Sequence, residues 1–174
     1  MAVLKVPITS DDHIQGDENA PIVLVEYGDY ECPHCGRAYP IVKRVQKHFG
    51  KKLMFVFRNF PLNEIHPDAE NAAEAAEFAA AHERFWEMHD AIFENQRSLG
   101  VPMLLELAKK LKLSVPDLSN ALTARQYASR VKSDFLGGVR SGVNGTPTFF
   151  INGNRHDAPF EFEDLVAAIE AIGE

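Results

Sequence analysis

The sequence of 174 residues is poor in cysteine, with only Cys32 and Cys35, which lie in one short segment. A disulfide between distant parts of the chain is therefore excluded, and the hydrophobic core must hold the fold together. Hydrophobic residues make up 45% of the sequence, which is enough for such a core in a single domain of this length.

Long hydrophobic runs and an excess of basic residues are also lacking. The longest apolar stretches, at residues 22–25 and 53–57, fall far short of the roughly 20 residues that cross a bilayer. Lys and Arg total 18 against 25 Asp and Glu, for a net charge of -7, which disfavours phosphate backbones and anionic lipid surfaces. We therefore expect no nucleic-acid partner and no membrane-embedded segment.

No secretory signal is visible at the start of the sequence. Residues 1–9 run directly into Ser10, Asp11 and Asp12, without a long apolar stretch or a small-residue cleavage site. This favours a cytoplasmic protein. The alternative is a periplasmic protein whose native export signal has been removed.

The first part of the chain predicts a strand, a helix and a second strand. Residues 22–27 are nearly all apolar, as in a strand buried on both faces. A helical pattern runs from Pro33 to about Phe49 and ends at Gly50, with Pro40 inside it. The next apolar run, at residues 53–57, is expected to lie parallel to the first strand, because a helix intervenes.

Residues 67–142 show helical patterns and no strand. Expected helices begin near Ala69, Phe85 and Pro102, and a short one follows Ser114, which with Asp117 resembles a capping box. A longer helix is predicted over residues 124–141. Its expected inner face comprises Tyr127, Val131, Phe135, Gly138 and Val139.

The last part returns to strand and ends in a helix. Residues 148–151 and a short partner near Arg155 and His156 flank Asn152-Gly153, a strong hairpin signal. The buried stripe of the final helix is predicted to be Phe162, Leu165, Val166, Ile169 and Ile172. We therefore predict one α/β domain over residues 1–174: a βαβ half at 15–62, an all-helical insertion at 66–142 and a ββα half at 143–174.

The segment Cys32-Pro33-His34-Cys35 indicates thiol chemistry. A thiolate is the reactive form of cysteine, and the start of a helix stabilises its negative charge. Cys32 is predicted to attack, and Cys35, one turn further in, to resolve the mixed disulfide. The alternative is that the two cysteines form half of a zinc site. Such sites usually need four ligands, and only scattered histidines such as His13 and His48 remain to complete one.

His82 and His89 lie on one predicted helix and could suggest a metal site there. Packing of His89 in the core is favoured over metal binding. We predict no metal and no cofactor beyond the cysteine pair.

The segment from Val25 to Cys35, VEYGDYECPHC, resembles the DsbA family of thiol-disulfide oxidoreductases, as does the downstream segment GTPTF at residues 145–149. The resemblance covers nearly the whole chain. It implies a thioredoxin fold, with βαβ and ββα halves around a central mixed sheet and a helical insertion between them. It also implies that Pro33 and His34 tune an oxidising site.

Roles are also expected for residues around the motif. His34 is expected to stabilise the Cys32 thiolate through its ring and backbone amide, the alternative being a solvated surface histidine. Glu26 is either a buried acid or an exposed residue of an edge strand; the resemblance favours the buried acid, which would move the proton of Cys35. Pro147 is implied to follow a cis bond against the disulfide, with Thr146 binding substrate backbone. The alternative is an ordinary trans peptide bond before Pro147 at the start of a strand, with no functional role. Arg58 either borders the active site or anchors a carboxylate in the fold.

Three functions are compatible with these residues. The favoured one is a dithiol oxidase that passes the Cys32–Cys35 disulfide to a reduced polypeptide through a mixed disulfide. The second is a cytosolic reductase or isomerase that uses the same residues on oxidised polypeptides. The third is a peptide-binding chaperone with incidental cysteines. Either exchange reaction needs a partner that recycles the site; the sequence names neither this partner nor the oligomeric state.

Overall fold

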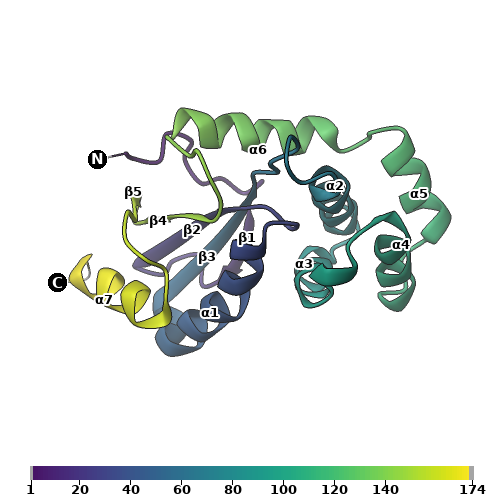
Figure 1. Cartoon of the computed structure of the whole chain (residues 1–174). Coiled ribbons are helices and arrows are strands. Elements are labelled where there is room, and N and C mark those ends of the chain that lie inside the picture. The colour runs from purple at the N-terminus through teal and green to yellow at the C-terminus, as the bar shows by residue number, and fades with distance from the viewer. Residues whose placement is uncertain (1, 173–174) are drawn as a thin grey trace.

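The computed structural model describes residues 2–172 and contains a five-stranded mixed sheet with helices around it (Figure 1). The strands are β1 (His13–Gly16), β2 (Ile22–Gly28), β3 (Leu53–Asn59), β4 (Thr148–Ile151) and β5 (Asn154–Arg155). The helices are α1 (Pro33–Phe49), α2 (Ala69–Ala80), α3 (Phe85–Glu94), α4 (Val101–Lys110), α5 (Val115–Thr123), α6 (Ala128–Arg140) and α7 (Phe162–Ile172). Single 3₁₀ turns lie at Gly50–Lys52 and Gln96–Ser98.

The strand order in the sheet is β1-β3-β2-β4-β5. β2 pairs in parallel with β3 and antiparallel with β4, so it lies at the centre of the sheet, and β4 forms a hairpin with β5. This arrangement confirms the expected mixed sheet with helices between its two halves. The exact division of the chain into halves and insertion stays a prediction.

The sheet has a hydrophobic core on each face. Side chains alternate along β2, so that Leu24 belongs to the core beneath α1, α3 and α7, whereas Val25 belongs to the core on the other face. Phe60 and Phe135 stack in this second core, where α6 packs against β3. Figure 1 shows α1 and α7 on one side of the sheet and α6 on the other.

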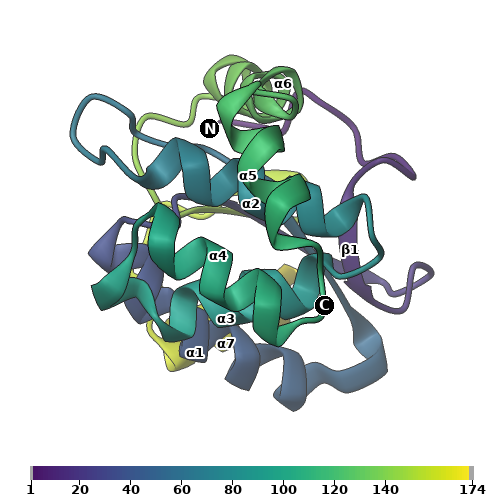
Figure 2. The same ribbon diagram turned by 90° about the vertical axis from the view of Figure 1, so that its right-hand side faces the viewer.

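The helical insertion packs closely because α2 is lined by small side chains. Six alanines of α2 are almost completely buried: Ala69, Ala72, Ala73, Ala75, Ala76 and Ala79. Short side chains allow neighbouring helices to approach, and α2 contacts α3, α4, α5 and α6. Figure 2 shows α2, α3, α4 and α5 grouped together on the side of the molecule that faces the viewer.

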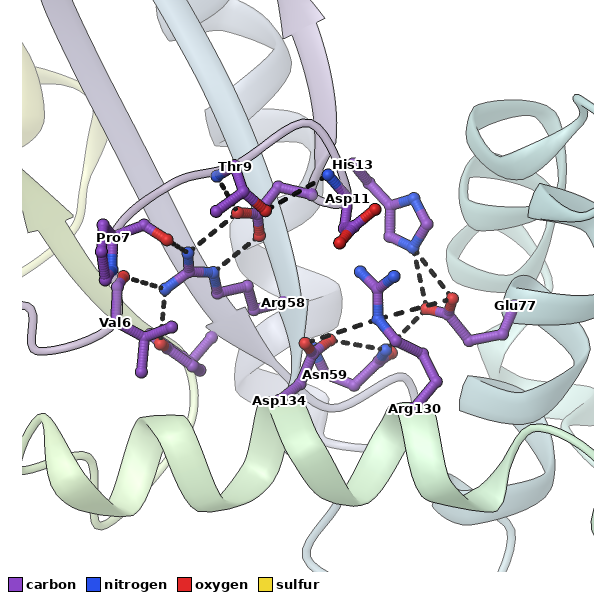
Figure 3. A network of polar contacts seen from close by, with 12 residues as sticks. Val6, Pro7, Thr9, Asp11, His13, Arg58, Asn59, Glu77, Arg130 and Asp134 are labelled. Atoms are coloured by element: carbon purple, nitrogen blue, oxygen red, sulfur yellow. Dashed lines mark hydrogen bonds and ion pairs between the residues drawn. The ribbon is translucent and has the colours of Figure 1, made fainter.

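Polar side chains join the insertion to the end of β3 (Figure 3). The Asn59 side-chain amide donates to Glu77 of α2 at 2.8 Å and to Asp134 of α6 at 3.0 Å. Arg58, which is 3% exposed, forms an ion pair with Asp12 at 2.8 Å. Of the two roles weighed for Arg58, anchoring a carboxylate is therefore the one observed.

Some sequence predictions were wrong in detail. Strand β1 was not predicted, because Ile14 is the only strongly apolar residue in it and pairing with β3 supplies its hydrogen bonds. The helix expected from residue 124 begins at Ala128, after Arg125 adopts a positive φ of 55°. Val139 is 50% exposed, because α6 turns Gly137 and Gly138 toward the sheet instead. Ile172 is 40% exposed rather than part of the buried stripe.

Within residues 2–172, no helix has both the length and the apolar character needed to cross a membrane. In the same part of the chain, no group of three or more His, Cys, Asp and Glu side chains is arranged to hold a metal ion.

Gly138 should not tolerate a side chain. A Cβ at this position would lie 2.7 Å from the ring of Phe60 and 3.0 Å from that of Tyr27. We expect Gly138→Ala to lower the free energy of unfolding by about 1–3 kcal/mol through overpacking, although alanine favours helix. Gly100→Ala, whose Cβ would make an ordinary 3.7 Å contact, is the control. Equal urea midpoints for both variants would contradict the close packing of α6.

Candidate active site

The two cysteines lie at the beginning of α1, directly after the turn that follows β2. Cys32 is the N-cap residue of α1, and Pro33 occupies the first helical position, where its fixed φ suits a helix and its missing N–H costs nothing. Cys35 is fully buried one turn further on, and Cys32 is 4% exposed. Both are free thiols, so the structure represents the reduced form.

The surroundings of Cys32 favour its thiolate. They lower its pKa from the ordinary value of 9.0 to about 5. The largest cause is the hydrogen bond from the Cys35 thiol, followed by the side chain of Thr146 and the backbone amides of Cys35 and His34; burial opposes them. At neutral pH the sulfur of Cys32 is therefore an anion, the form that carries out exchange.

The pKa values of Cys35 and Glu26 are raised, in contrast to that of Cys32. Burial raises the pKa of Cys35 well above its ordinary value, and the charges of Glu26 and Cys32 add to this effect. Glu26, on the central strand β2, is 3% exposed. Burial, with a contribution from the charge of Cys32, raises its pKa to about 8. The edge-strand interpretation of Glu26 is therefore excluded, and the site contains a neutral buried acid at neutral pH.

Thr146 and Pro147 face the helix start from the other side. The Thr146–Pro147 peptide bond is cis, and the Cys32 thiol donates to the carbonyl oxygen of Thr146, with Sγ and O 3.6 Å apart. The hydroxyl of Thr146 is buried and has no hydrogen-bond partner among the described residues. It is thus free to donate to the Cys32 sulfur when that sulfur is charged. The side chain of His34 is exposed, and its backbone amide is among the groups that lower the pKa of Cys32.

Asp29 is a site residue that the sequence interpretation missed, since it was taken only as the end of a strand. Its buried carboxylate accepts from the backbone amides of Glu31 at 2.8 Å and Cys32 at 3.2 Å. It also accepts from the Leu62 amide and from Nδ1 of His66. An aspartate whose side chain bonds the amide two residues later is a known turn pattern, so its position before the cysteine was a usable signal.

Two contacts tie the turn to the helical insertion. Gln96 donates to the carbonyl oxygens of Tyr30 and Cys32, each at 2.8 Å. Tyr30 is buried, and its hydroxyl lies 2.9 Å from Nδ1 of His89. The prediction that His89 packs in the core is confirmed, and burial lowers its pKa well below the ordinary value. Nothing in the sequence around Gln96 marks it as an active-site contact.

Removing the Thr146 hydroxyl should weaken the thiolate. Thr146→Val keeps the shape but not the donor, so we expect the ionisation midpoint of Cys32 to rise above about 5 by several tenths of a pH unit or more. The ultraviolet absorbance of the thiolate, followed against pH in reduced protein, measures this midpoint. Thr123→Val, at an exposed position whose hydroxyl bonds only Ser119 of its own helix α5, is the control. An unchanged midpoint in Thr146→Val would show that the hydroxyl does not reach the sulfur.

Comparison with known proteins places this geometry in a family. The family model described as thioredoxin matches residues 9–171. The chain is similar to the crystal structure of oxidised BdbD from Bacillus subtilis, with 26% identity, a TM-score of 0.87 and coverage of 98% of this chain and 97% of that one. It is also similar to alpha-DsbA1 of Wolbachia pipientis, at 21% identity and a TM-score of 0.82, over 97% and 93% of the two chains.

A longer protein shows higher sequence identity. The chain is 42% identical, over 167 residues, to a protein named Na(+)/H(+) antiporter NhaA 3 from Salinispora tropica. This match covers 95% of the chain but 26% of the antiporter, so the chain spans about a quarter of the length of this relative. The family match and the structural similarity agree with the site described above: the chain belongs to the thioredoxin family and has the fold of its DsbA-like members.

Proposed function

We propose that this protein is a dithiol oxidase that transfers the Cys32–Cys35 disulfide to polypeptide substrates. The observation that carries the proposal is the stabilised anion of Cys32, whose pKa is lowered to about 5. The hydrogen bonds that favour this anion are strong only when the sulfur carries a negative charge, which it does in the reduced protein and not in the disulfide. They therefore stabilise the reduced form relative to the disulfide and make the disulfide a stronger oxidant.

The reaction conserves atoms and electrons as follows. A thiolate of the substrate attacks the sulfur of Cys32, the Cys32–Cys35 bond breaks, and its electron pair goes to Cys35. A second substrate thiolate then attacks the substrate sulfur of this mixed disulfide, and Cys32 leaves as a thiolate. The substrate gains a disulfide and the cysteine pair gains two electrons. The disulfide itself is the oxidant, so no further cofactor enters the proposal.

Glu26 has the properties of the group that supplies a proton to Cys35. The high pKa of Cys35 makes its thiolate a poor leaving group unless it is protonated as it leaves. Glu26 is protonated at neutral pH because its pKa is raised to about 8, and the negative charge of its ionised form is among the causes that raise the pKa of Cys35. In the reverse direction the same carboxylate would accept the proton of Cys35.

The proposed reaction requires a binding site for the substrate and a partner that oxidises the cysteine pair again. We propose that extended polypeptide binds along the backbone at Thr146, where the carbonyl oxygen lies beside the reactive sulfur. A separate redox partner must remove two electrons from the cysteine pair after each transfer. Ion transport is no part of the proposal: the antiporter relative is about four times as long, and the matched stretch is the one that contains this fold.

The reduction potential of the cysteine pair tests the direction of exchange. We expect a value well above the thioredoxin value of about -270 mV. The measurement is equilibration in glutathione buffers of graded ratio, followed by acid quench, thiol alkylation and mass determination. Cys32→Ser should abolish oxidation of a reduced model protein. Cys35→Ser, when given oxidised glutathione, should accumulate a mixed disulfide at Cys32 and release one reduced glutathione, because no resolving thiol is left. A potential near or below that of thioredoxin would instead indicate the reductase or isomerase function, and full activity without either cysteine would indicate the chaperone.

Glu26→Gln should slow the exchange while leaving the thiolate of Cys32 in place. Loss of a general acid or base costs about a hundredfold or more in favourable cases, and the effect should be largest below pH 8, where Glu26 is protonated. Above that pH the difference between the variant and the wild type should shrink. Stopped-flow oxidation of a dithiol peptide across pH measures this. Glu106→Gln, an exposed position on α4, is the control, and identical pH profiles for wild type and Glu26→Gln would refute the role.

A further inference from the structure

Gln96 reaches the active-site turn from the helical insertion, at the first position of the 3₁₀ turn that follows α3. Its Nε2 group carries two N–H bonds, and both have an acceptor: the carbonyl oxygens of Tyr30 and Cys32, each at 2.8 Å. Because both neighbours are acceptors, the amide can face the turn only with its nitrogen. The side chain therefore makes a two-point contact with the backbone directly before and at the reactive cysteine.

Gly36 provides the space that this contact requires. A Cβ on Gly36 would lie 2.9 Å from Cδ of Gln96 and closer still to its Oε1. Any side chain at position 36 would displace the Gln96 amide. The backbone N–H of Gly36 also donates to the carbonyl oxygen of Cys32 at 3.0 Å, so this oxygen has two donors.

The turn is thus held by two side chains from different parts of the chain. Asp29 accepts from the amides of Glu31 and Cys32, while Gln96 donates to the carbonyls of Tyr30 and Cys32. The turn determines where the first amides of α1 point, and those of His34 and Cys35 are among the groups that act on the Cys32 sulfur. A shift of the turn would therefore move these donors relative to the sulfur.

We propose that Gln96 is a positioning residue for thiol-disulfide exchange: it fixes the backbone turn that carries Cys32 and thereby connects the helical insertion to the reactive sulfur. It touches no substrate atom and acts through the backbone. The proposal rests on the proposed function only in taking Cys32 as the reacting residue. It does not depend on whether the protein works as an oxidase or as a reductase.

The first test compares Gln96→Ala, Gln96→Glu and Gln96→Lys. Loss of the two hydrogen bonds should raise the ionisation midpoint of Cys32 in Gln96→Ala and shift the exchange equilibrium with glutathione by about three- to tenfold toward the disulfide form. Gln96→Glu should have a larger effect, because an acceptor and a negative charge then face two carbonyls. Gln96→Lys restores a donor and should return part of the shift. The measurements are thiolate absorbance against pH and the glutathione equilibrium.

Asn95→Asp is the matched control for Gln96→Glu. It makes the same change from amide to carboxylate one residue away, at an exposed side chain that bonds only Ala91 of its own helix. It should leave the midpoint of Cys32 where it is. A shift as large as that of Gln96→Glu would mean that charge alone is responsible, and would overturn the positioning role.

Gly36→Ala gives a second, independent test. It should displace Gln96 and raise the midpoint of Cys32 as Gln96→Ala does, yet have no further effect when Gln96 is already alanine. Such non-additivity is the expected outcome of the double-mutant cycle. Equal effects of Gly36→Ala in both backgrounds would overturn the proposal. So would a lower urea midpoint in Gln96→Ala with no change in ionisation or equilibrium. A reduction potential of the wild type close to that of thioredoxin would refute the proposed oxidase function. It would not change the outcome expected for this double-mutant cycle.

Discussion

The negative charge on the buried sulfur of Cys32 is the constraint around which the structure is organised. A charge removed from water is costly unless hydrogen-bond donors replace the water. Here the donors come from distant parts of the chain: the Cys35 thiol and two amides at the start of α1, and the hydroxyl of Thr146 from the loop before β4. β2 pairs in parallel with β3 and antiparallel with β4. The start of α1, which follows β2, and the Thr146 loop, which precedes β4, therefore lie at the same end of these strands.

The same constraint explains why the acid beneath the site is neutral. A second anion on β2 would oppose the thiolate, and burial raises the pKa of Glu26 to about 8, so the two groups differ in charge over most of the physiological range. This difference leaves one thiolate that can react and one neutral acid that can supply a proton to Cys35. The fold achieves it by placing Glu26 on its central strand and Cys32 at a helix terminus.

The sequence predicts this fold well where local patterns are strong. Continuous apolar runs identified β2, β3 and β4, and the helical spacing from Pro33 to Gly50 identified α1. Strand β1 was not predicted, because pairing with β3, rather than the apolar character of its own residues, supplies its stability. At the site, the motif located both cysteines, while Asp29 was passed over although it has a turn signal. Gln96 had no signal at all, because its contact is made 64 positions away in sequence from Cys32 and depends on how the insertion packs.

Both cysteines lie in one helical turn, and this limits how many electrons the chain can hold as well as which reaction it can carry out. With no third thiol in the sequence, the chain cannot pass its disulfide to another place within itself, and it cannot form a wrong internal pairing. In the proposed oxidase reaction, the cysteine pair of this chain accepts two electrons in each cycle. One mole of the chain would then oxidise one mole of dithiol, and any further oxidation requires that the pair be oxidised again.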